Sequence, residues 1–328
     1  YIYKSRSFAI SEVRDFFLTE KNMNLLKEMC QVRAAAGDEA PMKEYVLNYV
    51  RNNQATWKTQ PTIIEGNDFQ DCLILVFGKP RTAIYAHLDS IGFTVGYDNQ
   101  LIKIGGPRII EGTILVGSDS KGEIETKLVV EEKDEAKTVR CDFDRTIDRG
   151  TNLTFKCDFR LDDEFVQSCY LDNRLGMWSA LKVAETLEDG AIVFSCWEET
   201  GGGTAGYLGK YLFEKYQVRQ ALISDITWVT EGVQHGKGVA ISLRDSGLPR
   251  KKYLNKILAI ANKSDIPFQL EVESAGGSDG NALQKSSYPI DWCFIGAPED
   301  NVHSPDEKVH LKDIEAMHQL YSLLMKKL

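Results

Sequence analysis

Apolar and polar positions separate the chain into a long α/β pattern and a shorter pattern typical of a β unit. Apolar residues recur at helical spacing over 10–29, with an interruption near Asn22, and again over 39–51. Continuous apolar runs over 72–77 and 82–86 predict strands that are buried on both faces. From residue 172 onward, strand-like and helix-like segments alternate, which favours a mostly parallel sheet flanked by helices.

The elements predicted after residue 172 define this alternation. They are helices over 174–187, 204–213, 251–264 and 311–327, and strands over 191–197, 220–224, 239–243, 268–272 and 291–295. Between about 95 and 165 no helical period is visible, and short strand-like runs lie over 101–104, 109–115, 125–130 and 153–156. We therefore predict a mixed, mostly parallel α/β sheet in a discontinuous main domain (1–94 and 166–328), with an inserted small all-β domain at 95–165.

Composition and charge exclude several classes of protein. The 328 residues include 39 Lys and Arg against 48 Asp and Glu, a formal charge of −9, which argues against binding to nucleic acid or to an anionic membrane. No apolar run is long enough to span a bilayer, and the first residues lack the apolar core of a signal peptide. The seven scattered cysteines contain no Cys-x-x-Cys pair, a pattern that indicates reduced thiols and a cytoplasmic location.

Polar residues follow four of the predicted strands of the main domain, where ligands of open α/β sheets bind. They are His87 and Asp89 after 82–86, Glu198 and Glu199 after 191–197, Asp225 after 220–224, His303 in the loop after 291–295, and Asp172 at a helix start. Two imidazoles and several carboxylates without a cysteine suit divalent zinc, cobalt or manganese. A carboxylate between two metals about 3.5–4 Å apart would form a two-metal hydrolytic site.

Each of these residues also has an ordinary structural explanation. Asp172 can be a helix N-cap, Asp89 and Asp225 can cap turns, His87 can be a structural histidine, and the two glutamates can belong to a solvated loop. Ligands at separate strand ends, however, cannot form one shared metal site unless a carboxylate bridges them. Asp172 is the best placed residue for that position, so we predict it as the bridging ligand.

Local geometry adds two expectations about the candidate metal site. Residues two apart on an extended backbone point the same way, so Asp89 can accept the second ring N–H of His87. The adjacent side chains of Glu198 and Glu199 diverge. One of them can therefore ligate a metal while the other faces the attacking water as a general base.

Six short motifs occur in one order along the chain. They are His87-Leu-Asp-Ser-Ile-Gly-Phe93, Leu171-Asp-Asn-Arg174, Glu198-Glu-Thr-Gly201, Ser224-Asp225, Gly276-Gly-Ser-Asp279 and Val302-His-Ser-Pro305. In this order they resemble the co-catalytic zinc aminopeptidases of the glutamyl, deblocking and tetrahedral aminopeptidase group, metallopeptidase family forty-two. The resemblance covers most of the chain and implies a metalloaminopeptidase that removes N-terminal residues from short peptides.

The resemblance also implies a role for each site residue. One metal would be held by His87, Asp172 and Asp225, and the second by Asp172, Glu199 and His303; Glu198 would be the general base and Asp89 the residue that orients His87. It implies two divalent ions per chain, zinc foremost with cobalt or manganese as alternatives, and a cis peptide bond after Asp172. The expected substrate-binding residues are Gly277, Ser278, Asp279 and Asp300, and self-association into a homo-oligomer is expected through the inserted β domain.

Departures from the family pattern leave alternatives open. Ser90 replaces a glutamate, and Thr200-Gly-Gly-Gly203 is nearer to related zinc exopeptidases, which keeps a two-metal carboxypeptidase or deacylase as a rival. This chain has Glu299-Asp300-Asn301-Val302 before His303, where relatives usually carry Arg-Tyr. We therefore expect that acidic N-terminal residues are not preferred. A non-catalytic peptide-binding or assembly protein on the same scaffold is the second rival. Arg244 and Asp245 after a predicted strand can reach the substrate, although a structural pair is the favoured interpretation.

Overall fold

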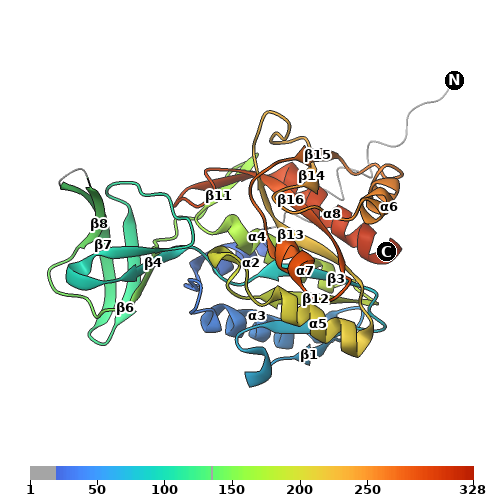
Figure 1. Cartoon of the computed structure of the whole chain (residues 1–328), viewed down its shortest axis with the longest axis horizontal. Helices are drawn as coiled ribbons and strands as arrows, with labels where there is room; N and C mark the ends of the chain where they lie inside the picture. The colour runs from blue at the N-terminus through green and yellow to red at the C-terminus, as the bar shows by residue number, and fades with distance from the viewer. Residues whose placement is uncertain (1–19, 134–135) are drawn as a thin grey trace.

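The computed structural model describes residues 20–133 and 136–328, and their strands form two sheets. The larger sheet has 11 strands, of which nine follow the order β1-β2-β12-β3-β13-β16-β17-β11-β10, while β14 pairs with β15 and β16. Figure 1 shows the smaller sheet standing to one side of the larger one. The part of the predicted helix over 10–29 that precedes residue 20 lies outside the described residues.

The centre of the larger sheet is parallel and its margins are antiparallel. The parallel strands are β12 (Gly190–Ser195), β3 (Thr82–His87), β13 (Gln220–Trp228) and β16 (Asp291–Asp300). The antiparallel additions are β1 (Thr62–Ile64), β2 (Leu73–Phe77), β10 (Arg160–Leu161), β11 (Phe165–Ser168) and β17 (Glu307–His310). The predicted mixed α/β sheet is therefore confirmed.

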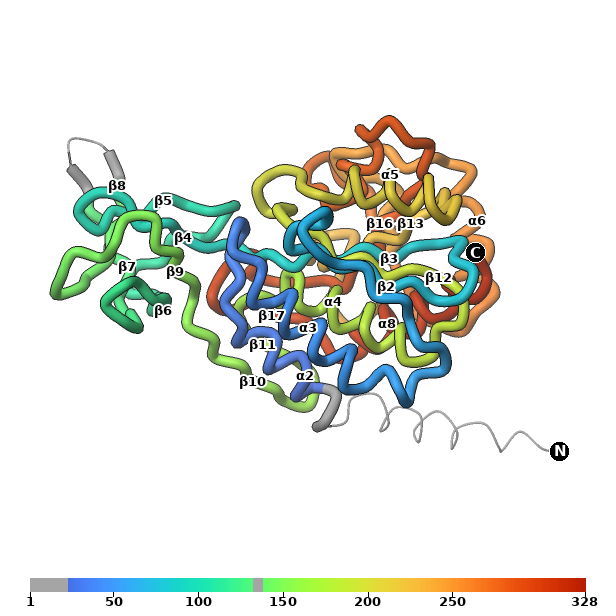
Figure 2. The backbone as a smooth tube through the Cα atoms, turned by 90° about the horizontal axis from the view of Figure 1, so that it is seen from below, coloured from blue at the N-terminus to red at the C-terminus, as the bar shows by residue number. Residues whose placement is uncertain are grey.

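Helices cover both faces of the larger sheet. On one face lie α2 (Glu20–Gln31), α3 (Ala40–Asn53), α4 (Leu171–Ala184) and α8 (Leu311–Lys327), and on the other lie α5 (Ala205–Tyr216) and α7 (Asp279–Lys285) (Figure 2). Helix α6 (Lys251–Ala261) packs near α8 at the end of the sheet. Every residue of β2, β3 and β12 is buried, as their continuous apolar runs predict. No helix of the described ranges is long and apolar enough to cross a membrane.

Several elements differ from the prediction because pairing between distant strands decides where a strand ends. Strand β13 continues past 224 to Trp228, since all nine of its residues pair with β16, and Asp225 therefore lies inside the strand. Strands β14 (Val239–Arg244) and β15 (Phe268–Val272) pair in parallel close to their predicted bounds. The strand predicted at 109–115 begins later, as β6 (Ile114–Asp119). A turn precedes it, in which the N–H of Thr113 donates to the carbonyl of Ile110.

The smaller sheet has six strands in the order β5-β4-β9-β6-β7-β8. They are β4 (Gly92–Val95), β5 (Leu101–Ile104), β6, β7 (Gly122–Lys133), β8 (Ala136–Asp142) and β9 (Asn152–Phe155). Phe93 and Phe155 meet edge to face in its separate core, and Phe155 stacks on Tyr170 at the junction with the main body. The chain leaves the larger sheet after β3 and pairs with it again at β10, so the strands of the smaller sheet begin before 95 and end before 165.

Candidate metal centre

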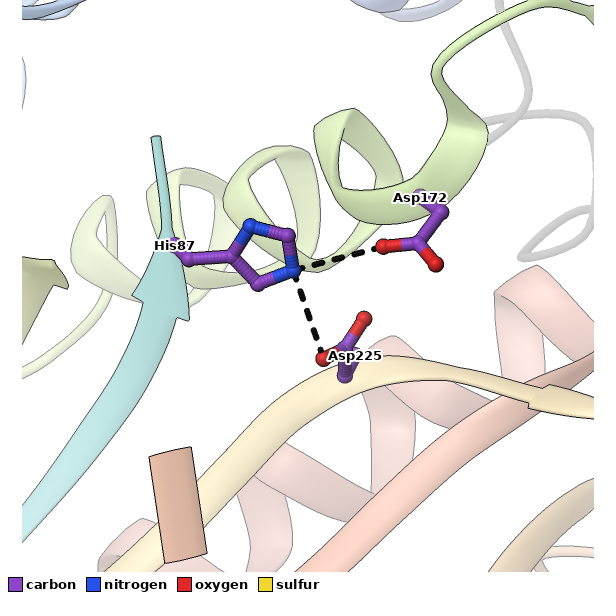
Figure 3. A group of neighbouring side chains, drawn as sticks. All are labelled: His87, Asp172 and Asp225. Atoms are coloured by element: carbon purple, nitrogen blue, oxygen red, sulfur yellow. Dashed lines mark ion pairs between the residues drawn. The ribbon is translucent and has the colours of Figure 1, made fainter. Parts of the chain in front are cut away.

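Five side chains that could ligate metal ions meet at the carboxyl ends of the parallel strands. His87 ends β3, Asp225 lies in β13, Glu199 lies in the 3-10 turn Glu198–Thr200 after β12, Asp172 starts α4 and His303 follows β16. They form two groups in which the ligand atoms lie within 4.8 Å of one another: His87 with Asp172 and Asp225, and Asp172 with Glu199 and His303. The first group is drawn in Figure 3, where the three side chains point toward one another from a strand, a helix start and a second strand.

Asp172 belongs to both groups because its two carboxylate oxygens face different partners. Its Oδ1 lies 3.3 Å from Nε2 of His87, which in turn lies 3.5 Å from Oδ2 of Asp225. Its Oδ2 lies 3.4 Å from Nε2 of His303, which lies 3.3 Å from Oε2 of Glu199. One carboxylate therefore stands between two separate sets of ligand atoms.

The start of helix α4 leaves the Asp172 carboxylate free for this position. The peptide bond between Asp172 and Asn173 is cis, as the resemblance implies, and both residues have non-helical backbone angles. Oδ1 of Asn173 accepts the N–H of Gly176 at 3.0 Å, and its Nδ2 donates to the carbonyl of Ser224 at 2.9 Å. The N-cap explanation of Asp172 is therefore wrong, because Asn173 satisfies the first turn of the helix.

Two buried carboxylates hold the turn that carries Glu198 and Glu199. Asp89 accepts the backbone N–H of Glu198 at 3.1 Å and that of Glu199 at 3.0 Å. Glu39, from the loop before α3, accepts the N–H of Trp197 at 3.2 Å. Three consecutive N–H groups are thus fixed from two distant segments. Ring atom Nδ1 of His87 lies 3.1 Å from the main-chain oxygen of Asp89 and 3.6 Å from its Oδ1, so the carbonyl is its nearer partner.

The site concentrates negative charge in a buried place. Burial raises the pKa of Glu199 to about 7, with the charge of Asp172 adding to the rise, and burial also raises the pKa of Glu198 well above its usual value. Burial lowers the pKa of His303, but the carboxylates of Asp172 and Glu199 outweigh it and raise this pKa to about 11. Carboxylates that resist ionisation in the bare protein are the expected partners of bound cations.

Two further glutamates surround the second group of ligands, and the sequence analysis missed both. Glu307 accepts the N–H of Asp172 at 3.2 Å and the N–H of His303 at 3.0 Å, so it fixes the backbone of two ligands. Glu299 at the end of β16 is 1 % exposed, and neither of its carboxylate oxygens has a hydrogen-bond partner among the described residues. Only the position of Glu307, four residues after a candidate ligand, offers a signal in the sequence.

A cavity of about 830 Å³ opens over the two groups. Among the expected substrate-binding residues, Gly277, Ser278 and Asp279 line this cavity. Ser278 donates to Oδ2 of Asp225 at 2.7 Å, and Asp279 accepts the hydroxyl of Ser195. Asp300 is not among the lining residues, because its carboxylate turns to His235, where Oδ2 lies 3.1 Å from the ring Nε2.

Solved structures of aminopeptidases share this fold. Aminopeptidase APDkam598 from the archaeon Desulfurococcus kamchatkensis superposes with a TM-score of 0.81 at 20% identity, over 94% of this chain and 95% of that chain. The Pyrococcus horikoshii TET1 peptidase superposes with a TM-score of 0.77 at 21% identity, over 93% of this chain and 99% of that one. These identities are low, so the superpositions establish the shared fold.

Comparison of sequences assigns the family. An Acetivibrio thermocellus protein named "Putative aminopeptidase" is 24% identical over 90% of this chain and 96% of its own length. The sequence model described as M42 glutamyl aminopeptidase matches residues 121–320, more than half of the chain. The family resemblance read from the six motifs is confirmed: the chain belongs to the M42 glutamyl aminopeptidase family of metal-dependent aminopeptidases and is a hydrolase of peptide bonds.

Proposed function

We propose that the protein removes N-terminal residues from short peptides with two divalent metal ions bound at the paired groups around Asp172. The observation that carries this proposal is the division of the Asp172 carboxylate, with one oxygen 3.3 Å from His87 and the other 3.4 Å from His303. A carboxylate that faces two separate sets of ligands is the arrangement expected of a bridging ligand in a two-metal site.

The residues present fit divalent ions of the zinc type. The donors are two imidazoles and three carboxylates, a set that suits zinc, with cobalt and manganese as alternatives. Nε2 of His87 is buried and has no hydrogen-bond partner among the described residues, although it faces two carboxylates. When bound, the ions would polarise the scissile carbonyl and lower the pKa of the attacking water.

Glu198 is the general base in this proposal. Its carboxylate lies 3.9 Å from Nε2 of His87, lines the cavity and belongs to neither ligand group. Burial raises its pKa well above the usual value, which suits a group that takes a proton from water and passes it to the leaving amine. Asp89 would position this base, because it holds the N–H groups of Glu198 and Glu199.

The test compares the activity and the metal content of the Glu198→Gln variant with those of the wild type. We expect about two divalent ions per chain in both proteins and a fall in kcat of about 10²–10⁴-fold in the variant. The exposed Glu44→Gln change on α3 is the matched control and should leave kcat unaltered. Full activity of Glu198→Gln would remove Glu198 from the mechanism.

Peptides with free and acetylated N-termini separate the rival functions. An aminopeptidase cleaves the free peptide and leaves the acetylated one, whereas a carboxypeptidase cleaves both at similar rates and a deacylase releases the acyl group. A metal-free, folded protein that binds peptides without cleaving them would identify the non-catalytic alternative.

We also propose a homo-oligomer in which residues 95–165, which carry most of the smaller sheet, act as an inserted domain for self-association or substrate access beside the main domain of 1–94 and 166–328. The Pyrococcus horikoshii TET1 peptidase assembles into a tetrahedron or a large octahedral shell. On the smaller sheet of this chain, Tyr97 and Ile102 are 71% and 58% exposed. Exposed large apolar side chains of this kind support a surface that is covered in an assembly.

A further inference from the structure

Three carboxylates gather on the cavity wall beyond Asp225, outside both groups of metal ligands. Asp245 follows β14, Glu271 lies in β15 and Glu273 follows β15, and all three line the cavity. Asp245 and Glu271 are only 6% and 4% exposed. Burial raises the pKa of Asp245 to about 6, with the charge of Glu271 adding to the rise, so the carboxylates repel one another.

None of these three carboxylates has a close cationic partner among the described residues, although the charge of Arg244 acts to lower the pKa of Asp245. Within the described ranges, none of the three forms an ion pair with a lysine, arginine or histidine within 4.0 Å. Arg244 does not form the pair with Asp245 that the sequence favoured. Its Nε donates instead to the main-chain oxygens of Asp245 at 3.3 Å and Glu273 at 3.1 Å.

The two buried carboxylates accept hydrogen bonds from neutral groups of the protein. Asp245 accepts the N–H of Gly247 through Oδ1. Glu271 accepts the hydroxyl of Thr227 through Oε1. Buried charges in proteins are normally paired with an opposite charge, so buried carboxylates that line a cavity without an ion-pair partner favour a cationic ligand.

An exposed aromatic side chain lines the same cavity. Trp228 ends β13, lines the cavity and is 41% exposed. Gly276 packs against its indole so closely that a Cβ there would lie 3.3 Å from the ring. A cavity lined by an exposed indole and by buried carboxylates suits a ligand with an aliphatic stem and a cationic head, which packs its methylenes on the ring and places its charge beyond them.

The carboxylates of Asp245, Glu271 and Glu273 together form an acidic wall of the cavity. The register of β13 sets the distance from the proposed metal ligands to this acidic wall. Asp225 and Thr227 are two residues apart, so their side chains lie on one face of the strand, about 7 Å apart along it. The hydroxyl of Thr227 anchors Glu271 at that distance. The four-carbon stem of a lysine spans such a separation when its α-carbon lies beside the metal ligands.

We propose that Asp245, Glu271 and Glu273 form the subsite for the side chain of the substrate's N-terminal residue, and that this residue is lysine or arginine. The inference rests on the proposed aminopeptidase function and names its substrate class. An acidic N-terminal side chain is excluded by repulsion, which gives a physical reason for the preference expected from the missing arginine before His303.

The test compares tripeptides that differ only in their first residue, with the metal-loaded full chain as the enzyme. The kcat/KM of peptides that begin with lysine or arginine should exceed that of the norleucyl peptide by about tenfold or more. Norleucine keeps an unbranched aliphatic stem without the charge. The peptide that begins with glutamate should have the lowest kcat/KM. In the Glu271→Gln and Glu273→Gln variants, the kcat/KM of the lysyl peptide divided by that of the norleucyl peptide should fall severalfold, by at most about tenfold. Glu44→Gln on the far surface of α3 is the matched control and should keep the wild-type ratio.

The outcomes separate the subsite from the function on which it rests. Cleavage of norleucyl or leucyl peptides as fast as lysyl peptides would overturn the subsite and leave the aminopeptidase proposal intact. An unchanged ratio in both glutamine variants would also overturn it. If no peptide with a free N-terminus is cleaved, the proposed function fails, and the subsite fails with it.

Discussion

Substituting alanine for Gly176 tests the packing that supports both metal groups. Gly176 lies in α4, and a Cβ at this position would lie 2.1 Å from Oδ1 of Asn173 and 2.1 Å from the main-chain oxygen of Ser224. Asn173 follows Asp172, the proposed bridging ligand, and Ser224 precedes Asp225. One added methyl group would therefore press on the backbone beside two proposed ligands.

The expected size of the effect follows from two opposing contributions. Alanine is favoured over glycine in a helix interior by about 0.5–1 kcal/mol. Overpacking a rigid site costs about 1–3 kcal/mol, and each hydrogen bond lost from Asn173 costs about 1 kcal/mol more. One of the clashing atoms is a strand carbonyl that cannot rotate away, so we expect Gly176→Ala to lower the free energy of unfolding by about 2–4 kcal/mol.

Thermal unfolding at one scan rate measures this difference. Gly176→Ala should melt at least about 4 °C below the wild type. The matched control is Gly206→Ala in α5, where an added Cβ comes no nearer than 3.6 Å to another atom, so its Tm should stay the same or rise slightly. A Gly176→Ala protein that melts at or above the wild-type temperature would refute the close approach of α4 to β13.

Two further measurements test other parts of the structure. Burial raises the pKa of Glu39 from 4.5 to about 7, so the folded protein holds this proton more tightly than the unfolded chain. The free energy of unfolding therefore includes the full contribution of Glu39 below pH 4.5 and falls by about 3 kcal/mol as the pH rises to 7. Glu39→Gln should lose this fall in urea unfolding between pH 4.5 and 8, and matching pH profiles of the two proteins would contradict the assignment. For the assembly, charged substitutions at Tyr97 and Ile102 should lower the mass seen in analytical ultracentrifugation, whereas a monomeric wild type would remove the proposed oligomer.

Local sequence patterns determined the main outline of the molecule. The apolar runs of β2 and β3 predict strands buried on both faces, because a chain segment without polar alternation has no face for water. The polar residues after these strands marked the site, since carboxyl ends of parallel strands meet at one edge of a sheet. The two groups of candidate ligands around Asp172 lie at this edge of the sheet. The family matched by the sequence model is the one that the motifs at these positions resemble.

Tertiary structure alone decided how the site is supported. Glu39 and Asp89 hold three neighbouring N–H groups of the Trp197–Glu199 turn, yet Glu39 lies more than 150 residues away in the chain and carries no local signal. Strand β13 extends to Trp228 only because β16 pairs with it throughout. A hydrophobic pattern records which residues are buried, but it does not record which distant strand buries them.

The acidic wall shows the same limit. Asp245 directly follows β14 and Glu271 lies in β15. Helix α6 separates these strands along the chain, and their parallel pairing places both residues on one cavity. In the sequence each is an isolated carboxylate near a strand end. Asp172 likewise had a predictable position, but the directions of its two oxygens depend on His87 and His303, which reach it from opposite parts of the chain. Residue type and spacing are local properties, whereas the distances between charges are set by packing.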